Sequence, residues 1–244
     1  MISFDDKDII ICTKDLVRTY YSRGREVRAL RGLSIEVPLG EYVAIQGRSG
    51  SGKTTLINCI GGLDRPTSGE VFFKGRPITQ LSEREITRLR RVEYSFVFQS
   101  FALLATFSAY ENVELPLRIQ GLSRRERRDR TMGSLAVVGL SKWAKHRPYE
   151  MSGGQQQRVA VARALVTRPE VILADEPTGE LDSSSGRQIM SLFQKISIEE
   201  NVTVLMVTHD PIVEEYASLV YHLGDGVILD VVEHPQNRMV PQEA

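Results

Sequence analysis

The sequence predicts an α/β fold whose core is a parallel sheet with a phosphate-binding edge. Two observations predict this fold class. The segment from Gly47 to Thr54 matches the phosphate-loop pattern, and it lies between a β-prone run and an apolar run that can start a helix. Residues 171–176 and 203–208 are apolar runs that turn polar only at their ends. Such runs are typical of parallel strands that are buried on both faces.

The composition fits one large domain, or one domain with an inserted lobe. The chain has 244 residues, of which 41% are hydrophobic and 25% are charged, so it can bury a substantial core. Its formal net charge is zero, which gives no indication of a general affinity for nucleic acid or anionic lipid. Cys12 and Cys59 form no disulfide pattern, as is usual in a reducing cytosol. Cys59 is expected to pack as a small hydrophobe.

The sequence predicts no membrane anchor. Residues Met1 to Lys7 lack the basic region of a secretory signal. No apolar run approaches the length that spans a bilayer. If the protein works at a membrane, we expect another subunit to supply the membrane part.

The segment up to the phosphate loop is expected to consist of strands. Ile9–Cys12, Leu33–Val37 and Tyr42–Ile45 are rich in β-prone residues, and the second alternates apolar and polar positions. A helix is expected to begin near Gly52 and to continue into the apolar run after it. Tyr20 falls between the first strands, where a tyrosine commonly fills core or surface; stacking on an adenine is the competing interpretation.

The next segment combines a strand, a capped helix and a second strand. Residues 70–78 predict a strand followed by a turn. Ser82 is expected to cap a charged helix, because Glu85 stands at capping-box spacing. Residues 96–98 form a short apolar run that predicts a buried strand ending at Gln99.

From Ser100 to about Pro148 the pattern is helical, and five arginines crowd residues 124–130. Glu126 and Asp129 interleave with these arginines, so a solvated helix face is the favoured interpretation. Towards the other end of the chain, residues 219–232 predict a β-hairpin around a Gly-Asp-Gly turn.

The phosphate loop has the chemistry to hold ATP phosphates and Mg²⁺. Its glycines permit positive φ angles and keep Cβ atoms away, so backbone N–H groups can turn towards phosphate oxygens. The helix start adds unpaired N–H groups and a positive dipole end. Lys53 is expected to reach the β- and γ-phosphates, and Thr54 to hold Mg²⁺. A glycine-rich turn that matches by chance is the alternative. The predicted nucleotide-binding residues here are Gly47, Ser49, Gly50, Ser51, Gly52, Lys53, Thr54 and Thr55.

Two carboxylates and a histidine follow the two apolar runs. Ligands of open parallel sheets bind at the carboxyl ends of strands, so Asp175 and Glu176 are expected beside the phosphate loop. Asp175 is expected to coordinate Mg²⁺, directly or through water, and Glu176 to orient or deprotonate the attacking water. A solvated acidic strand end is the alternative. For His209, at the end of the second run, a γ-phosphate contact competes with a structural role.

A second helix start with small residues lies at Ser152, Gly153, Gly154 and Gln155, before an alanine-rich helix. Free N–H groups at a helix start can bind an anion. A well-capped helix without any ligand explains the same pattern, and the residues alone do not separate these two interpretations.

In chain order, these motifs resemble the nucleotide-binding domain of ABC ATPases. The resemblance covers essentially the whole chain, and other phosphate-loop families lack a Ser-Gly-Gly-Gln signature between the Walker A and Walker B motifs. Residues 98–104, 111–113 and 175–179 are most similar to the MacB, LolD and FtsE branch. ATPases of that branch serve exporters, lipoprotein extractors or mechanotransmitters.

The resemblance implies roles for single residues. Tyr20 corresponds to the adenine-stacking aromatic residue, and Gln99 to the Q-loop residue that touches Mg²⁺ and the membrane partner. Asp182 corresponds to the D-loop aspartate, and His209 to the switch histidine. The implied catalytic residues are Glu176, His209 and Gln99, the implied metal ligands are Thr54, Gln99 and Asp175, and the implied signature contacts to ATP are Ser152, Gly153, Gly154 and Gln155.

The resemblance also implies a domain organisation. Residues 1–244 form one nucleotide-binding domain with a RecA-like core. The core and an antiparallel β-subdomain take about 1–98 and 163–244. An inserted helical subdomain takes about 99–162.

A two-copy mechanism follows from the resemblance. The phosphate loop, Walker B carboxylates and His209 of one copy form half a site, and the signature helix of a second copy closes over the γ-phosphate. ATP then joins the two copies, and hydrolysis releases them. Coupling passes through a groove at Gln99 to a separate permease subunit, which places the chain at the cytoplasmic side of the membrane, with no nucleic-acid partner.

Two residues depart from the family pattern. Met151 stands where the signature usually has Leu, an apolar exchange of similar volume that a core tolerates. Glu180 stands where this branch commonly has Asn. A carboxylate there is expected to affect the dimer seam, and with it the hydrolysis rate.

Two rival functions differ in what they require. A non-transport ABC ATPase acting on DNA, the ribosome or the division machinery would carry a long coiled-coil insertion or tandem cassettes, and this chain has neither. A regulatory ABC subunit without hydrolysis would lack the catalytic glutamate or the switch histidine. Glu176 and His209 are both present.

Overall fold

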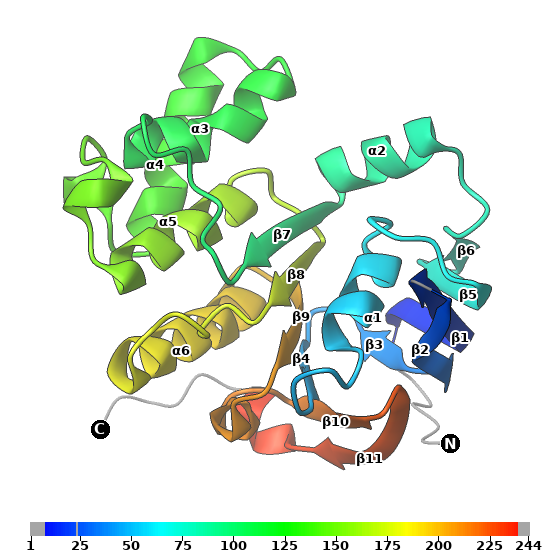
Figure 1. Ribbon diagram of the computed structural model, residues 1–244. Helices are drawn as coiled ribbons and strands as arrows, with labels where there is room; N and C mark the ends of the chain where they lie inside the picture. The colour runs from blue at the N-terminus through cyan, green and yellow to red at the C-terminus, as the bar shows by residue number, and fades with distance from the viewer. Residues whose placement is uncertain (1–7, 23, 239–244) are drawn as a thin grey trace.

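The computed structural model describes residues 8–22 and 24–238, and it contains two sheets and six α-helices (Figure 1). Residues Met1 to Lys7, for which no secretory signal is predicted, lie outside the described residues. Within the described residues, no helix is long and apolar enough to cross a bilayer.

The larger sheet has six strands in the order β11-β10-β4-β9-β8-β7. Neighbours from β10 to β7 pair in parallel, and β11 closes the sheet as the antiparallel partner of β10. The predicted parallel core and the predicted closing hairpin are therefore confirmed. The strands are β4 (Tyr42–Gln46), β7 (Tyr94–Phe98), β8 (Val171–Asp175), β9 (Thr203–Thr208), β10 (Leu219–Gly224) and β11 (Val227–Glu233).

The second sheet is antiparallel, with the order β2-β1-β5-β6 and β3 paired to β1. One expected strand, Leu33–Val37, is wrong, because Leu33 ends β2 and β3 begins only at Glu36. The break is held by the Thr13 hydroxyl, which donates to the Leu33 carbonyl and accepts from the Ile35 N–H. The strands are β1 (Ile9–Ser22), β2 (Arg25–Leu33), β3 (Glu36–Pro38), β5 (Ser68–Phe73) and β6 (Arg76–Pro77).

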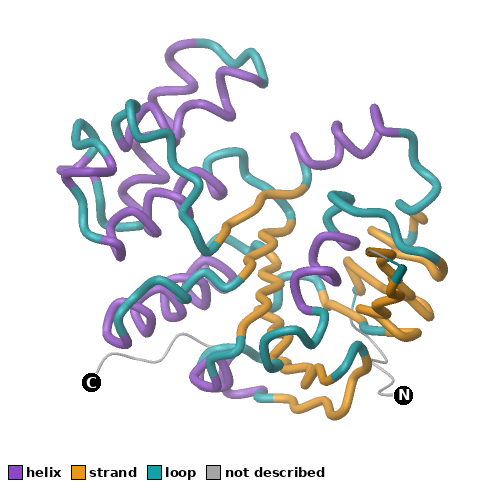
Figure 2. Tube along the Cα trace, viewed as in Figure 1, coloured by secondary structure: helices purple, strands orange, loops and turns teal. Residues whose placement is uncertain are grey.

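Three of the helices form a group apart from the antiparallel sheet, as Figure 2 shows. The predicted helical region after Ser100 is confirmed only from Ala109 onwards, because residues 99–108 form a loop. The predicted capping box of Ser82 and Glu85 is present at the start of α2. The helices are α1 (Lys53–Ile60), α2 (Glu83–Val92), α3 (Ala109–Ile119), α4 (Arg124–Val137), α5 (Gly153–Leu165) and α6 (Ser183–Glu199), with short 3-10 turns at 141–143, 148–150, 211–215 and 235–238.

The two faces of the parallel sheet carry separate hydrophobic cores. Alternate residues of a strand point to opposite faces. Ala174 and Met206 join the core of α3 to α6, whereas Leu173 and Leu205 join the core of α1 and the antiparallel sheet. The phosphate-loop helix and the signature helix α5 therefore lie on opposite sides of the sheet (Figure 1).

The arginine-rich stretch forms the first half of α4, and one of its members is held by a buried acid. Glu114 of α3 is 3% exposed and accepts from Arg118 Nε at 2.6 Å and from Arg127 Nε at 3.0 Å. Burial raises the pKa of Glu114, but the two arginine hydrogen bonds outweigh it and leave this pKa lowered. Arg124, Arg125 and Arg128 are exposed, as expected for a solvated face.

Candidate functional site

The phosphate loop connects β4 to α1 and is held by backbone hydrogen bonds to the end of β9 and to the turn between β10 and β11. The Gly47 N–H donates to the Thr208 carbonyl at 3.1 Å, and the Gly226 N–H donates to the Ser51 carbonyl at 3.0 Å. Gly52 has φ +105°, and a Cβ there would lie 2.4 Å from the Ala29 carbonyl oxygen. Only glycine meets both conditions, so this conformation of the loop requires glycine at position 52.

The loop encloses Lys53, whose side chain is 5% exposed. Its ammonium donates to the carbonyls of Gly47 at 2.8 Å and Arg48 at 3.0 Å. The Ser51 hydroxyl is buried and has no hydrogen-bond partner in the described part of the chain. A buried hydroxyl without a partner is costly, and a phosphate oxygen would satisfy it. The loop therefore fits a phosphate group.

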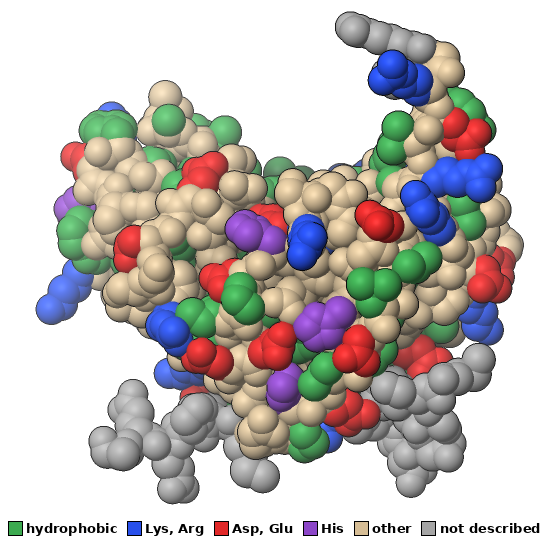
Figure 3. Space-filling view, turned by 60° about the horizontal axis from the view of Figure 1, so that its bottom comes forward, with side chains coloured by type: hydrophobic (Ala, Val, Ile, Leu, Met, Phe, Trp, Pro, Cys, Tyr) green, Lys and Arg blue, Asp and Glu red, His purple; other side chains and the backbone are tan. Residues whose placement is uncertain are grey.

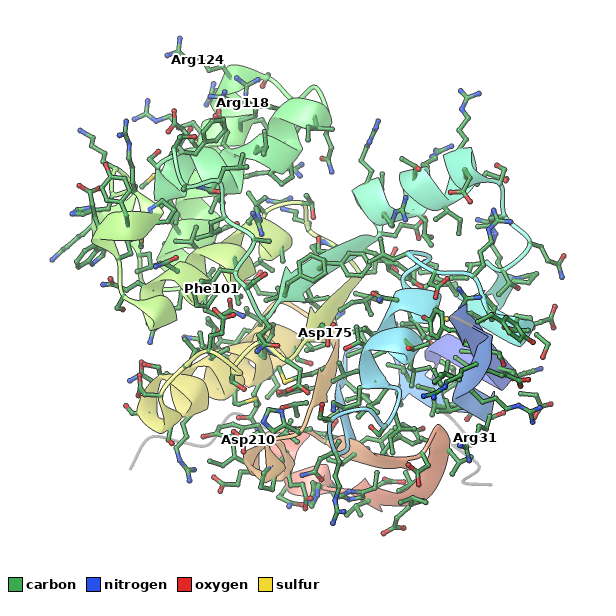
Figure 4. All side chains as sticks on the ribbon, in the orientation of Figure 1. Arg31, Phe101, Arg118, Arg124, Asp175 and Asp210 are labelled. Carbon is green, nitrogen blue, oxygen red and sulfur yellow. The ribbon has the colours of Figure 1, made fainter. Side chains whose placement is uncertain are left out.

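Thr54 and Asp175 supply adjacent oxygens at the start of α1 and the end of β8, where Figure 4 labels Asp175. The Thr54 hydroxyl donates to Asp175 Oδ1 at 3.1 Å. Hard cations such as Mg²⁺ prefer oxygen ligands and keep several from water or phosphate. Residues 8–22 and 24–238 contain no cluster of three histidine, cysteine or acidic residues suited to a metal. A metal here would take its further ligands from water or from a bound phosphate.

Burial raises the pKa of Asp175, an effect that the Thr54 hydrogen bond opposes and that Glu176 reinforces. A carboxylate with a raised pKa destabilises the folded state when it is charged. Stability therefore increases as the pH falls through this raised pKa towards the ordinary value.

We expect Asp175→Asn to raise the melting temperature of the nucleotide-free protein by a few degrees at pH 7, because it removes a half-buried charge. The difference from the unmodified protein should shrink as the pH is lowered to about 4. Thermal unfolding at both pH values checks this. A variant less stable at pH 7 would contradict the electrostatic account.

Glu176 is held at both carboxylate oxygens. Its Oε1 lies 3.2 Å from Lys53 Nζ, and its Oε2 lies 2.7 Å from His209 Nδ1. The carboxylate is 15% exposed, whereas the His209 side chain is 63% exposed. Glu176 also has φ +47°, which is rare for a residue with a side chain and is characteristic of functional sites. The predicted meeting of the phosphate loop, the two carboxylates and His209 is present.

Gln99 follows β7, whose last residue Phe98 is paired with Asp175. It is exposed, and a Cβ on Gly179 would lie 2.8 Å from its Nε2 atom. The amide therefore packs on the segment after the two carboxylates. In the described chain no hydrogen bond joins Gln99 to Thr54 or Asp175, so its metal contact stays a prediction.

The signature residues lie apart from the phosphate loop. The Ser152 hydroxyl accepts from the Gln155 N–H at 3.3 Å, and Gln155 Oε1 accepts from the Ser152 N–H at 3.0 Å. The helix is therefore well capped, and its predicted contact with an anion stays a prediction. Cβ atoms on Gly153 and Gly154 would lie 3.3 Å from Leu181 and 3.2 Å from Ser185. The first turn of α5 therefore faces the segment that begins α6.

Asp182 caps α6. Its carboxylate accepts from the Ser185 N–H at 3.0 Å and from the Ser185 hydroxyl at 2.7 Å. These hydrogen bonds lower its pKa. Asp182 therefore orders the segment that faces the signature glycines, and its contact with a nucleotide stays a prediction.

Tyr20 lies on β1 within a polar cluster. Its hydroxyl donates to Asp64 Oδ2 at 2.6 Å, and the Arg18 guanidinium lies 4.5 Å from the ring centroid. Arg18 also binds Asp64 at 2.7 Å. The ring is half-buried, and its stacking on adenine stays a prediction.

The sequence motifs did not indicate two sets of supporting contacts. The turn of the β10–β11 hairpin approaches the phosphate loop, with Gly226 bound to Ser51 and the Leu223 carbonyl beside Gly47. Buried Asn112 and Gln157 bind the loop around Gln99. In the sequence, the only signal for the contacts of Asn112 and Gln157 is that each is a polar residue within an apolar helix face.

A family model described as ABC transporter matches residues 30–179. The macrolide export ATP-binding/permease protein MacB of Hyphomonas neptunium is 47% identical over 220 residues, which cover 90% of this chain and 34% of MacB. The uncharacterized ABC transporter ATP-binding protein MJ1508 of Methanocaldococcus jannaschii is 43% identical, over 91% of this chain and 99% of that protein. The chain thus spans about a third of the MacB relatives it matches.

Solved structures agree in fold. The dimeric post-hydrolysis state of the ATP-binding cassette MJ0796 bound to ADP and Pi, also from M. jannaschii, has a TM-score of 0.84 and 41% identity, over 92% of this chain and 98% of that chain. The protein cbiO1 of Clostridium perfringens, part of the transporter complex cbiONQ, has a TM-score of 0.85 and 31% identity, over 94% of this chain and 90% of that chain. The predicted fold class, a RecA-like phosphate-loop core with an antiparallel β-subdomain and a helical subdomain, is confirmed.

Proposed function

Because the chain belongs to the ABC transporter family of ATP-binding proteins, we propose that it binds and hydrolyses ATP to drive a membrane complex of the MacB or LolD type. The contacts of Lys53 with Glu176 and of Thr54 with Asp175 carry this assignment. They bring the phosphate-binding segment and the acidic strand end into one site. If the glycine-rich segment matched the phosphate-loop pattern only by chance, its contacts with Glu176 and Asp175 would not be expected.

ATP is proposed to bind with its β- and γ-phosphates at the phosphate loop. Lys53 then exchanges its bonds to loop carbonyls for bonds to phosphate oxygens. Bound Mg²⁺, with ligands from Thr54, Asp175 and Gln99, supplies positive charge against the charge that develops on the phosphate. Tyr20 is proposed to stack on the adenine.

Glu176 is proposed as the base that accepts a proton from the attacking water. A base must lie within hydrogen-bond reach of that water and keep its orientation. Lys53 and His209 fix the two oxygens of this carboxylate, and the exposed His209 ring can reach towards the γ-phosphate. Glu176 thus acts on the water, and Lys53 and His209 orient the Glu176 carboxylate.

A second copy is proposed to complete the site with Ser152, Gly153, Gly154 and Gln155. The small residues at the start of α5 leave N–H groups near an open surface, and the solved relative MJ0796 is dimeric. Asp182 caps α6, and the first turn of α6 faces the signature glycines. Two ATP molecules would then lie between two copies, and the residues from 99 to 162 would form the helical subdomain of each.

A permease subunit is proposed to dock beside the Gln99 segment. An apolar groove of about 350 Å³ lies between α2, β7, α3 and the end of α5, and its lining includes Phe96, Pro116 and Ile119. Ile119 is 60% exposed, which suits a covered position in a complex. This docking would hold the chain at the cytoplasmic side of the membrane. Nucleic acid is not proposed as a partner, since charges of both signs are dispersed over the face in Figure 3.

Ser152→Arg tests the two-copy site. The larger side chain should block closure of a second copy, so ATP-driven dimerisation and hydrolysis should fall by about tenfold or more. ATP affinity of the monomer should be nearly unchanged, because Lys53 and Thr54 are untouched. Equilibrium ATP binding and size exclusion with ATP measure the two effects.

Mixing the Ser152→Arg and Lys53→Ala variants provides the control, because one intact composite site forms from the two. Partial return of hydrolysis would locate the signature contact in the second copy. Loss of monomer ATP affinity with normal dimerisation would show instead that the signature acts within its own chain.

A further inference from the structure

The loop of residues 99–108 is fixed by polar side chains of two helices. At its start, Gln157 of α5 donates to the Phe98 carbonyl at 3.4 Å. At its end, Asn112 of α3 donates to the Leu104 carbonyl at 3.1 Å and accepts from the Leu104 N–H at 2.8 Å. Gln157 and Asn112 are fully buried. The loop is therefore part of the packed structure at both ends.

Between these ends, the backbone is strained at two consecutive residues. Phe101 has φ +54° and Ala102 has φ +50°, and the Ala102 N–H donates to the Ser100 carbonyl in a tight turn. Residues with side chains rarely adopt this left-handed conformation, and they keep it only where the surroundings impose it.

Arg163 of α5 binds the carbonyl groups of both left-handed residues. Its guanidinium donates to the Phe101 carbonyl at 3.0 Å and to the Ala102 carbonyl at 2.5 Å. No carboxylate pairs with it among residues 8–22 and 24–238, and burial lowers its pKa. An ion pair therefore does not explain why this partly buried charge is here. Its planar guanidinium presents two N–H donors in a fixed geometry to these two successive carbonyl groups.

The strained turn brings the Phe101 ring to the signature. A Cβ on Gly153 would lie 3.7 Å from Phe101 Cζ and 3.3 Å from Leu181 Cδ2. Figure 4 labels Phe101 between α5 and α6. Gly153 is the first residue of α5 and Arg163 lies near its last, so α5 contacts this loop from both ends of the helix.

We propose that Arg163 is a positioning residue that makes the loop after Gln99 and the signature helix α5 move as one body. A partner that displaces Gln99 would then also displace Ser152 and Gly153. This inference rests on the proposed two-copy ATPase, because the signature must meet ATP on another copy for the link to matter. Arg163 itself would not touch ATP, and its side chain also lines the groove proposed for the permease subunit, so the test uses the chain without a permease.

Arg163→Ala is the test. Without the guanidinium, the Phe101–Ala102 turn should relax and the signature should lose its support. ATP-driven dimerisation and hydrolysis should fall by about fivefold or more, while ATP affinity of the monomer stays within twofold or so of the unmodified protein. Hydrogen exchange of residues 100–104 should become faster, which gives a readout that does not depend on activity.

Two further variants separate positioning from simple stabilisation. Ala102→Gly in the Arg163→Ala background should restore part of the dimerisation, because glycine adopts the left-handed conformation without support. Arg168→Ala is the matched control: Arg168 is exposed just beyond α5, and its side chain makes no hydrogen bond to another described residue. It should behave as the unmodified protein does.

The outcomes are distinct. If the unmodified protein neither dimerises nor hydrolyses ATP, the proposed function fails. If the unmodified protein does both and Arg163→Ala does them equally well, the positioning role of Arg163 is wrong. It is also wrong if Ala102→Gly restores none of the lost dimerisation. Reduced dimerisation with intact monomer affinity, together with partial rescue, supports the inference.

Discussion

Glu176→Gln is expected to slow ATP hydrolysis by about 10²- to 10⁴-fold while ATP still binds. The amide has nearly the same shape as the carboxylate, but it cannot accept a proton from water. Asp175 and Thr54 are unchanged, so their metal oxygens are retained. With turnover blocked, an ATP-bound dimer should accumulate on size exclusion. Single-turnover hydrolysis and equilibrium ATP binding measure the two effects separately.

Glu199→Gln is a matched control for this experiment. Glu199 lies at the end of α6, is half exposed, and among residues 8–22 and 24–238 pairs only with Lys195, at 3.7 Å. Its replacement should leave hydrolysis unchanged. Near-normal turnover of Glu176→Gln would remove Glu176 from the role of base and leave the site without an assigned one.

Lys53→Ala is expected to weaken ATP binding and to reduce hydrolysis by about 10²- to 10³-fold, because it deletes the charge that faces the transferred phosphate. It also removes the cation 3.2 Å from Glu176 and the two bonds that draw the loop carbonyls inward. Titration with ATP and steady-state hydrolysis check both effects.

Misfolding would imitate this result, so thermal unfolding of Lys53→Ala must accompany it. Lys195→Ala makes the same change at an exposed position of α6 and should alter neither ATP affinity nor turnover. Unchanged ATP affinity in a folded Lys53→Ala protein would refute the phosphate-loop assignment.

The two departures from the family pattern have different structural settings. Met151 is 7% exposed and belongs to the core of α3 to α6, so it fills an apolar position as Leu would. Glu180 is exposed, and its carbonyl oxygen lies 4.0 Å from a Cβ placed on Gly153. The backbone of Glu180 therefore lies beside the signature glycine of the surface proposed for the second copy.

Local features were predictable because they depend on neighbours in the chain. The strands 171–175 and 203–208 are apolar except at their ends, as is typical of strands buried on both faces. The capping boxes at Ser82 and Ser152 need only a side chain three residues away. The prediction of one strand over Leu33–Val37 was wrong because it ignored a distant residue. The chain is interrupted after Leu33, where its backbone bonds to the Thr13 hydroxyl of a different strand.

By itself, the sequence determined the parallel core, the phosphate loop and the set of residues at one sheet edge, because strand direction places the ends of β4, β8 and β9 together. Only the tertiary structure decided which atoms of these residues meet. Lys53 against Glu176, Gly226 against Ser51 and Arg163 against Phe101 are contacts between distant segments. Packing selects such contacts after the elements have formed, and no spacing within the chain encodes them.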